Sequence, residues 1–309
     1  MLPFKLIYHD RYDLHLGEHV FASQKYRLVR ETLLREKLTD EGDFLQPELA
    51  ADADVLRVHS QEWVRKLKTG KLSLTELMRL EIPYSKETIE AFWFAAGGTI
   101  LAGQRALEDG LSVNIGGGFH HAFPEHGEGF CAIHDVAIAI RRLQFDKAVA
   151  TAMVVDTDVH HGNGTAEIFG GDGDIFTLSI HQENNYPYPK PASNIDVHLR
   201  DGIGDADYLA IFEKHLIQAF HDFHPDVLLY IGGADPYIED QLGGLRLTME
   251  GLQRRDRLVF DHARRLGVPV AVTLAGGYAR RVEDTVRIHI NTICAARDAA
   301  TPNSPAMHS

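Results

Sequence analysis

Five short apolar runs along the chain predict buried β-strands, because strands covered on both faces lack alternating polar positions. They fall at residues 111–115, 148–155, 174–180, 226–231 and 268–274. Longer segments with apolar residues at helical spacing lie at residues 23–38, 85–107, 135–143, 207–220 and 248–266. The first two of these begin at serine, a favoured helix N-cap. Strands alternating with helices predict an α/β fold with a mostly parallel sheet and helices on both faces.

The domain organisation follows from the absence of any internal repeat or low-complexity linker. The 309 residues are 44% hydrophobic, which is ample for one large core. We therefore expect a single domain over residues 1–300. Residues 301–309 are polar and contain two prolines, so we expect a flexible tail there.

Charge and cysteine content exclude several classes of protein. Lys and Arg total 31 against 44 Asp and Glu, a net charge of −13, whereas nucleic-acid binders normally carry the opposite balance. The only cysteines, Cys131 and Cys294, form no disulfide framework or thiolate zinc cluster and favour a reducing compartment. No apolar run approaches the roughly 20 residues of a membrane span. We expect a cytoplasmic protein with no nucleic-acid or membrane partner.

Each predicted strand is followed by a glycine-flanked polar motif. In chain order, the motifs are GGGFHHA, DTDVHHGNG, HQENN, GGADP and AGGY. Open α/β sheets build their sites at the carboxyl ends of the strands. The pattern therefore predicts a functional site at that edge, provided that the sheet brings these strand ends together.

The DTDVHHGNG and GGADP motifs contain a candidate metal site. Asp158 and His160 are two residues apart, a spacing that lets both side chains point to one side of an extended segment. Asp235 follows another strand and supplies a third ligand, which leaves a fourth position open for water, as in hydrolytic zinc sites. In the alternative interpretation, Asp158 caps the following helix and His160 packs against it.

Histidines and a tyrosine suggest acid–base chemistry beside that metal. The chain has 18 histidines, and two adjacent pairs, His120-His121 and His160-His161, lie beside glycine. The first pair suits removal of a proton from a metal-bound water and donation of a proton to a leaving amine. Asp156 and Asn163 flank the metal motif and are candidates to orient these two rings. The alternative is a solvated pair of loop histidines.

Tyr278 ends the AGGY motif after the last predicted strand. A phenol hydroxyl there can donate a hydrogen bond to the oxyanion of a tetrahedral intermediate. A buried tyrosine bonded to a backbone carbonyl is the alternative interpretation.

These motifs, in this order, resemble the histone deacetylase and deacetylase-like amidohydrolase family. The likeness rests on GGGFHHA, GEGFCAIHDVAIA, VVDTDVHHGNGT, IGGADP with LGGLRLT, and LAGGYA. ADADVLRVHSQEWVRKL resembles the family's early segment, so the likeness covers nearly the whole chain. HVFASQKYRLV and LGGLRLT look most similar to its class IV branch.

The resemblance implies a role for each matching position. It implies zinc ligands at Asp158, His160 and Asp235, with iron as the alternative metal, Tyr278 as oxyanion donor, and His121 as general base beside His120. It also implies an acyl-lysine tunnel lined by Gly129, Phe130 and Tyr186, with Leu242 at its mouth. A potassium site would use oxygens of Asp156, Asp158, His160 and Ser179.

Three positions depart from related patterns. Many family members carry aspartate where this chain has Asn163, which weakens the support for the basicity of His121. Arginases, which share the fold, bind a second metal through carboxylates where this chain has Gly162 and Gly233. The sequence therefore favours one catalytic metal.

The predicted function is zinc-dependent hydrolysis of acetyl or longer acyl groups from lysine side chains, in proteins or in small acylated amines. One alternative is an acylpolyamine amidohydrolase, which would need a carboxylate near the tunnel mouth to pair with the cationic substrate. Another is a non-catalytic acyl-lysine binding module, which would need neither the complete ligand set nor Tyr278. The sequence makes no prediction of the oligomeric state.

Overall fold

The computed structural model describes residues 1–301, which form one eight-stranded sheet in the order β2-β1-β3-β8-β7-β4-β5-β6. Every strand pair is parallel. The strands are β1 (Lys5–Ile7), β2 (Phe44–Leu45), β3 (Leu111–Asn114), β4 (Ala152–Asp156), β5 (Ile175–Gln182), β6 (Ile195–Leu199), β7 (Val227–Ile231) and β8 (Val270–Thr273). All carboxyl ends therefore point to the same edge, as predicted.

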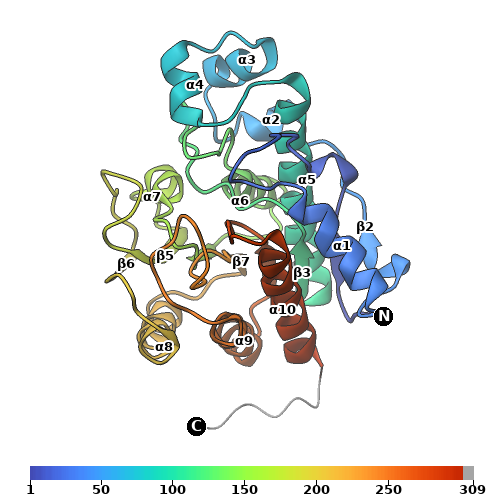
Figure 1. The fold of residues 1–309 in the computed structure, drawn as a ribbon, viewed down its shortest axis with the longest axis vertical. Coiled ribbons are helices and arrows are strands. Elements are labelled where there is room, and N and C mark those ends of the chain that lie inside the picture. Colours follow the sequence, from blue (N-terminus) through green and yellow to red (C-terminus); the bar gives the residue numbers. More distant parts are fainter. Residues whose placement is uncertain (302–309) are drawn as a thin grey trace.

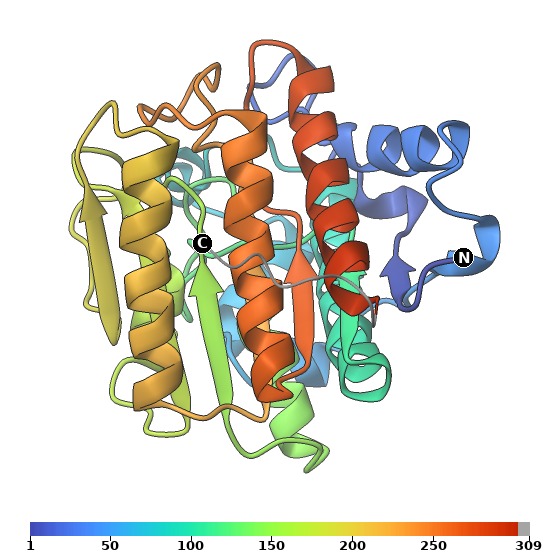
Figure 2. The ribbon, with the colours of Figure 1, turned by 90° about the horizontal axis from the view of Figure 1, so that it is seen from below.

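Helices cover both faces of the sheet (Figure 1). They are α1 (Lys25–Arg35), α2 (Asp52–Val55), α3 (Gln61–Thr69), α4 (Leu74–Leu80), α5 (Lys86–Asp109), α6 (Asp135–Phe145), α7 (Asn163–Phe169), α8 (Asp205–Asp222), α9 (Met249–Leu266) and α10 (Val282–Ala300), with short 3₁₀ turns at Asp10–Tyr12 and Glu41–Asp43. Figure 2 shows α8, α9 and α10 side by side across one face. Helix α5 packs on the other face against β3 and β8, beside α6.

The central strands are apolar along their whole length because both of their faces are buried. In β4, Met153 and Val155 belong to the core cluster under α9 and α10, whereas Ala152 and Val154 belong to the cluster under α5 and α6. The period of two along a strand sends successive side chains to opposite layers. This is why the predicted strands appear as continuous apolar runs rather than alternating ones.

The sequence missed the three strands that lie at or near the edges of the sheet. Strands β1 and β2 are too short to give a pattern. Strand β6, an edge strand with the sequence IDVHL, carries polar residues Asp196 and His198. Its apolar content is therefore lower than that of the central strands.

The predicted caps had different outcomes. The Ser85 side chain accepts a hydrogen bond from the Thr88 amide and caps α5, as expected. The expectation for Ser23 is wrong, because Gln24 is the N-cap of α1. The Ser23 hydroxyl instead donates to Asp13 Oδ1.

The single domain over residues 1–300 stays a prediction, and the eight strands described within residues 1–301 form one sheet. Of the predicted tail at 301–309, residues 302–309 lie outside the described part of the chain. No helix within residues 1–301 is long and apolar enough to cross a membrane.

Candidate active site

Sheet order brings the strand-end motifs together. Strands β3, β8, β7 and β4 are consecutive neighbours, and their carboxyl ends are followed by the loops of His120, Tyr278, Asp235 and Asp158 respectively. The sequence alone left this convergence open. Four segments that are far apart in the chain thus form one site at the carboxyl edge of the sheet.

Asp158, His160 and Asp235 form a compact group. Each offers one ligand atom, and these atoms all lie within 4.8 Å of one another. His160 Nδ1 is 3.0 Å from Asp158 Oδ1 and 3.4 Å from Asp235 Oδ2. All three side chains are buried. The alternative role of Asp158 as a helix cap does not occur, because Gly162 is the N-cap of α7.

Charge in this group fits a bound divalent cation. Burial and the neighbouring Asp158 carboxylate raise the pKa of Asp235 to about 7. Burial opposes the charged form of His160, yet the two carboxylates raise the pKa of that ring to about 10. Asp235 Oδ2 is buried and has no hydrogen-bond partner within residues 1–301. Two buried carboxylates with an unsatisfied oxygen suit a metal ion, and the Asp-His-Asp donor set suits zinc.

Glycines make room for this arrangement. A Cβ at Gly276 would overlap the Oδ2 atoms of both Asp235 and Asp158. A Cβ at Gly233 would lie 2.6 Å from Asp158 Cα, and one at Gly162 would lie 2.5 Å from Asp156 Oδ2. The second carboxylates of an arginase-type site therefore have no space here.

His120 is bound to a carboxylate, as the spacing suggested. Its Nδ1 lies 2.6 Å from Asp156 Oδ2, and its Nε2 lies 3.8 Å from Asp158 Oδ1. Burial disfavours the charged ring, but Asp156 and Asp158 outweigh it and raise the pKa of His120 to about 9. These two carboxylates therefore favour the protonated form of His120.

His121 differs from its neighbour because its partner is an amide. Its Nδ1 lies 2.7 Å from Asn163 Oδ1. Burial, together with positive charge on His120 and His160, holds the pKa of His121 well below its ordinary value. The ring is therefore unprotonated at neutral pH and free to accept a proton. The two rings lie with their centroids 4.0 Å apart.

Glu128 orients the Asn163 amide, a role that sequence reasoning missed. Asn163 Nδ2 donates to Glu128 Oε1 at 2.6 Å, so its Oδ1 faces His121. The Tyr186 hydroxyl donates to the same carboxylate oxygen at 2.9 Å. Glu128 thus links the Tyr186 hydroxyl to the Asn163 amide, which in turn contacts His121. It lies in the GEGF motif, directly before Gly129, but nothing local in the sequence indicates this pairing.

A cavity of about 190 Å³ leads to the metal group. Its lining includes the predicted tunnel residues Gly129, Phe130, Tyr186 and Leu242, together with His121, His160 and Tyr278. Asn185 and Glu81 line it as well, and neither was predicted. The Glu81 carboxylate places a negative charge at this cavity although position 242 is leucine.

Lys25 is a buried cation near the metal group that sequence reasoning also missed. Its Nζ donates to the carbonyl of Ala275 at 2.5 Å and lies 5.8 Å from the centroid of the Tyr278 ring. Burial lowers the pKa of Lys25 to about 8, although Asp235 and Asp158 oppose this shift. No sequence signal links Lys25 to residues some 250 positions away.

Ser179 is paired in register with Asp156 on the neighbouring strand, so the two residues of the predicted potassium site are adjacent. The Ser179 hydroxyl lies 3.0 Å from His181 Nδ1. Asp156 Oδ1 accepts from the Asp158 amide. The potassium site itself stays a prediction.

Comparisons with known proteins show the family to which this chain belongs. A histone deacetylase domain model matches residues 19–293. An uncharacterised protein from Picosynechococcus is 39% identical over 96% of this chain and 99% of its own, and histone deacetylase 2 of Arabidopsis thaliana is 31% identical over 91% of this chain and 77% of its own. The crystal structure of a histone deacetylase homologue from Aquifex aeolicus shares the fold, with a TM-score of 0.81 and 24% identity over 94% of this chain and 83% of that one. The chain belongs to the histone deacetylase family and is a hydrolase of the deacetylase type.

Proposed function

We propose that this protein is a zinc-dependent hydrolase that removes acetyl or longer acyl groups from lysine side chains. The observation that carries the proposal is the compact group of Asp158, His160 and Asp235 beside the His120–His121 pair, with His121 and His160 both lining one cavity. An acyl-lysine binding module would need no such group. Zinc is the metal that this donor set suits, and iron is the alternative.

Asp158, His160 and Asp235 would hold the ion. When bound, it would polarise the amide carbonyl and lower the pKa of a water molecule at its open position. His121, held unprotonated by its surroundings, accepts the proton of the attacking water. The water oxygen bonds to the carbonyl carbon, and Tyr278 donates a hydrogen bond to the oxygen that becomes negative.

Collapse of that intermediate breaks the C–N bond and releases a carboxylic acid and an amine. The departing nitrogen receives its proton from the His120–His121 pair, which lies beside the cavity. Asp156 holds His120 in its charged form, and Asn163 with Glu128 fixes the orientation of His121. The proposal includes a potassium ion, which oxygens of Asp156, Asp158, His160 and Ser179 would hold and which would stabilise the loop that carries the metal ligands.

The substrate is expected to enter as an extended, uncharged stem. Phe130 and Tyr186 wall the cavity, and Leu242 offers apolar contact without counter-charge. This favours the methylene stem of an acyl-lysine and tolerates a longer acyl chain. Turnover of acyl-lysine peptides that is lost on chelation and restored by zinc would support the proposal. Absence of hydrolysis in a zinc-loaded sample across several acyl lengths would refute it.

An acylpolyamine is the second candidate substrate, because Glu81 places a carboxylate at the cavity and would pair with a distal ammonium group. The test compares kcat/KM for an acetyl-lysine peptide and an acetylated polyamine in the parent, Glu81→Gln and Leu242→Glu. We expect the parent to prefer the peptide and Leu242→Glu to shift towards the polyamine. A parent that prefers the polyamine, with Glu81→Gln abolishing that preference, would establish the second candidate.

A further inference from the structure

The two adjacent histidines after β4 belong to different groups of side chains. His160 lies in the catalytic group, whereas His161 Nε2 lies 3.1 Å from Asp196 Oδ1 on the edge strand β6. His161 is fully buried. Nothing in the proposed hydrolysis uses it.

His161 is one member of a second compact group of metal-ligating side chains. His161, His181 and Asp196 each offer one ligand atom, and these atoms all lie within 4.8 Å of one another. The ring centroids of His161 and His181 are 4.6 Å apart. A third imidazole adjoins the group, since His198 Nδ1 lies 2.8 Å from His181 Nε2. The donors of this group come from three neighbouring parts of the sheet. His161 lies in the loop between β4 and α7, His181 lies on β5, and Asp196 and His198 lie on β6.

In the described part of the chain, hydrogen bonds leave one nitrogen of this group without a partner, whereas both nitrogens of His181 are paired, with Ser179 and with His198. His161 Nδ1 is buried and has no partner within residues 1–301. A neutral imidazole needs a donor on one nitrogen and an acceptor on the other, so one side of this buried ring is left unpaired. Asp196 Oδ2, in contrast, accepts from the Ser193 amide, which fixes the carboxylate in place facing His161.

We infer that His161, His181 and Asp196, with His198 as the outer ligand, form a second zinc site that is separate from the catalytic one. Imidazole and carboxylate donors select zinc and neighbouring first-row metals rather than magnesium or potassium, which prefer oxygen. His161, His181 and Asp196 would supply three ligands, and His198, which now contacts His181, would have to turn towards the ion to supply the fourth ligand of a closed structural site.

The position of His198 suggests a route by which zinc could enter this site, and the position of the site suggests a structural role. His198 is exposed and lines a surface cavity beside β6, so an ion can reach the buried histidines through it. A zinc ion there would tie the edge strand to β5 and to the loop that carries Asp158 and His160. It would stabilise that loop without touching the substrate.

The test counts zinc on the full-length protein by native mass spectrometry after loading and buffer exchange. We expect two zinc ions on the parent, one on Asp235→Ala, one on Asp196→Ala and none on the double variant. His221→Ala, which removes an exposed histidine beside Asp222, is the matched control and should keep both ions. An Asp196→Ala protein with as much zinc as the parent, or a folded Asp235→Ala protein with none, would overturn the site.

A second measurement guards against misfolding of the buried variants. In the Asp235→Ala background, zinc should still raise the unfolding temperature, because only the second site remains to bind it. Adding His198→Ala, a change at an exposed position, should weaken the zinc affinity at least tenfold while circular dichroism stays unchanged. If zinc protects both proteins equally, or protects neither, His161, His181 and Asp196 are a hydrogen-bonded cluster only.

Discussion

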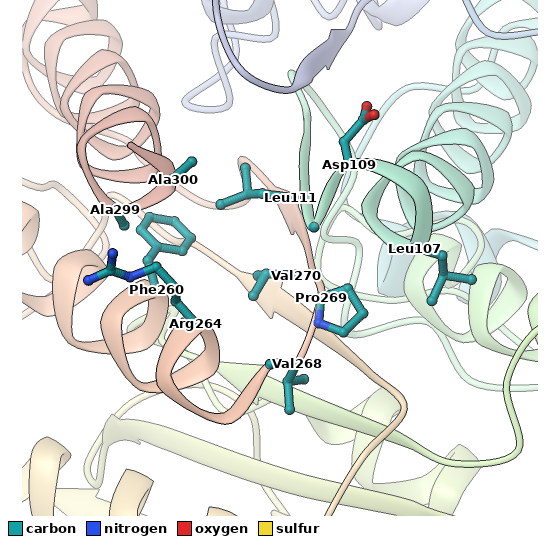
Figure 3. Close-up of a pocket in the computed structure, with 12 residues that line it drawn as sticks. Leu107, Asp109, Leu111, Phe260, Arg264, Val268, Pro269, Val270, Ala299 and Ala300 are labelled. Carbon is teal, nitrogen blue, oxygen red and sulfur yellow. The ribbon is translucent and has the colours of Figure 1, made fainter. Parts of the chain in front are cut away.

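A cavity lies at the amino ends of the strands and another at their carboxyl ends, which we call the amino edge and the carboxyl edge of the sheet. The larger of these two cavities lies at the amino edge, away from the candidate active site. The cavity at the amino ends of β3 and β8 measures about 350 Å³, against about 190 Å³ for the one at the carboxyl ends. Figure 3 shows its lining, which is mostly aliphatic, with Asp109 and Arg264 coming from different helices. Neither of the two groups of metal-ligating side chains found within residues 1–301 contributes to its lining. Convergent buried charge, rather than volume, marks the site.

The two edges differ in polarity because different connecting segments lie at the two ends of each strand. At the amino edge, α5 and α9 end at Gly110 and Gly267, both with positive φ, and the chain turns directly into apolar strand residues. At the carboxyl edge, the same strands run into glycine-rich loops that hold polar side chains close together. A single sheet thus separates a stabilising edge from a reactive one.

We expect the largest loss of turnover when an aspartate at the carboxyl end of β7 is replaced, and almost none when an aspartate at its amino end is replaced. Asp235→Ala removes a metal ligand and should abolish zinc binding at the catalytic group, with a loss of turnover well beyond the roughly 10–100-fold cost of removing an outer-shell partner. Asp226 lies just before the same strand and accepts from the amides of Ala150 and Thr151. Asp226→Ala should lower stability but keep turnover. Equal losses in both variants would show that the two edges are not functionally distinct.

A smaller effect is expected from Tyr278→Phe, which deletes one hydroxyl at the inner end of the catalytic cavity. If this hydroxyl donates to the oxyanion, turnover should fall on the order of 10²–10³ with zinc content and unfolding temperature unchanged. The aromatic ring and its contact with Phe21 remain. A rate within a few-fold of the parent would make Tyr278 a packing residue.

A smaller effect again is expected on the pH dependence of turnover, which the two histidines His120 and His121 should control. The rate should rise with pH as His121 loses its proton, at a pH below the ordinary value for histidine, and fall as His120 deprotonates towards about 9. A bound cation would lower the pKa of both rings, so both limbs would lie at lower pH in the metal-loaded protein. Asn163→Asp alone would put a new carboxylate at the position that now lies 2.6 Å from the Glu128 carboxylate, and the two negative charges would repel each other. We therefore combine it with Glu128→Gln.

In that double variant, the negative charge moves next to His121 while the net charge stays constant. A nearer carboxylate raises the pKa of the base, and the base must be unprotonated, so the acidic limb should move to higher pH. Glu128→Gln alone serves as the control. An unmoved limb would mean that His121 is not the group that titrates there.

The carboxyl edge could be predicted from sequence largely because its signals are local. Each apolar run is followed within a few residues by glycine and a polar side chain, so the ligands and the two histidine pairs stand out. The contacts that refine them are not local: Glu128 meets Asn163 across 35 positions, and Lys25 meets Ala275 across 250. Strand β6 was missed for a related reason, since its polar Asp196 and His198 break the apolar pattern.

The smallest expected effect tests the amino edge itself. Ala300 lines its cavity at the end of α10, so Ala300→Leu would fill part of the space with apolar volume. Because no group of the proposed mechanism lies there, turnover and the pH profile should stay within about twofold of the parent. Filling a cavity commonly stabilises a protein by about 0.5–2 kcal/mol, so the unfolding temperature should hold or rise slightly. The measurement is kcat/KM beside a thermal melt. A tenfold fall in kcat/KM without a change in the melt would show that the amino edge communicates with the catalytic group through β3 or β8, and that the two ends of the sheet are not independent.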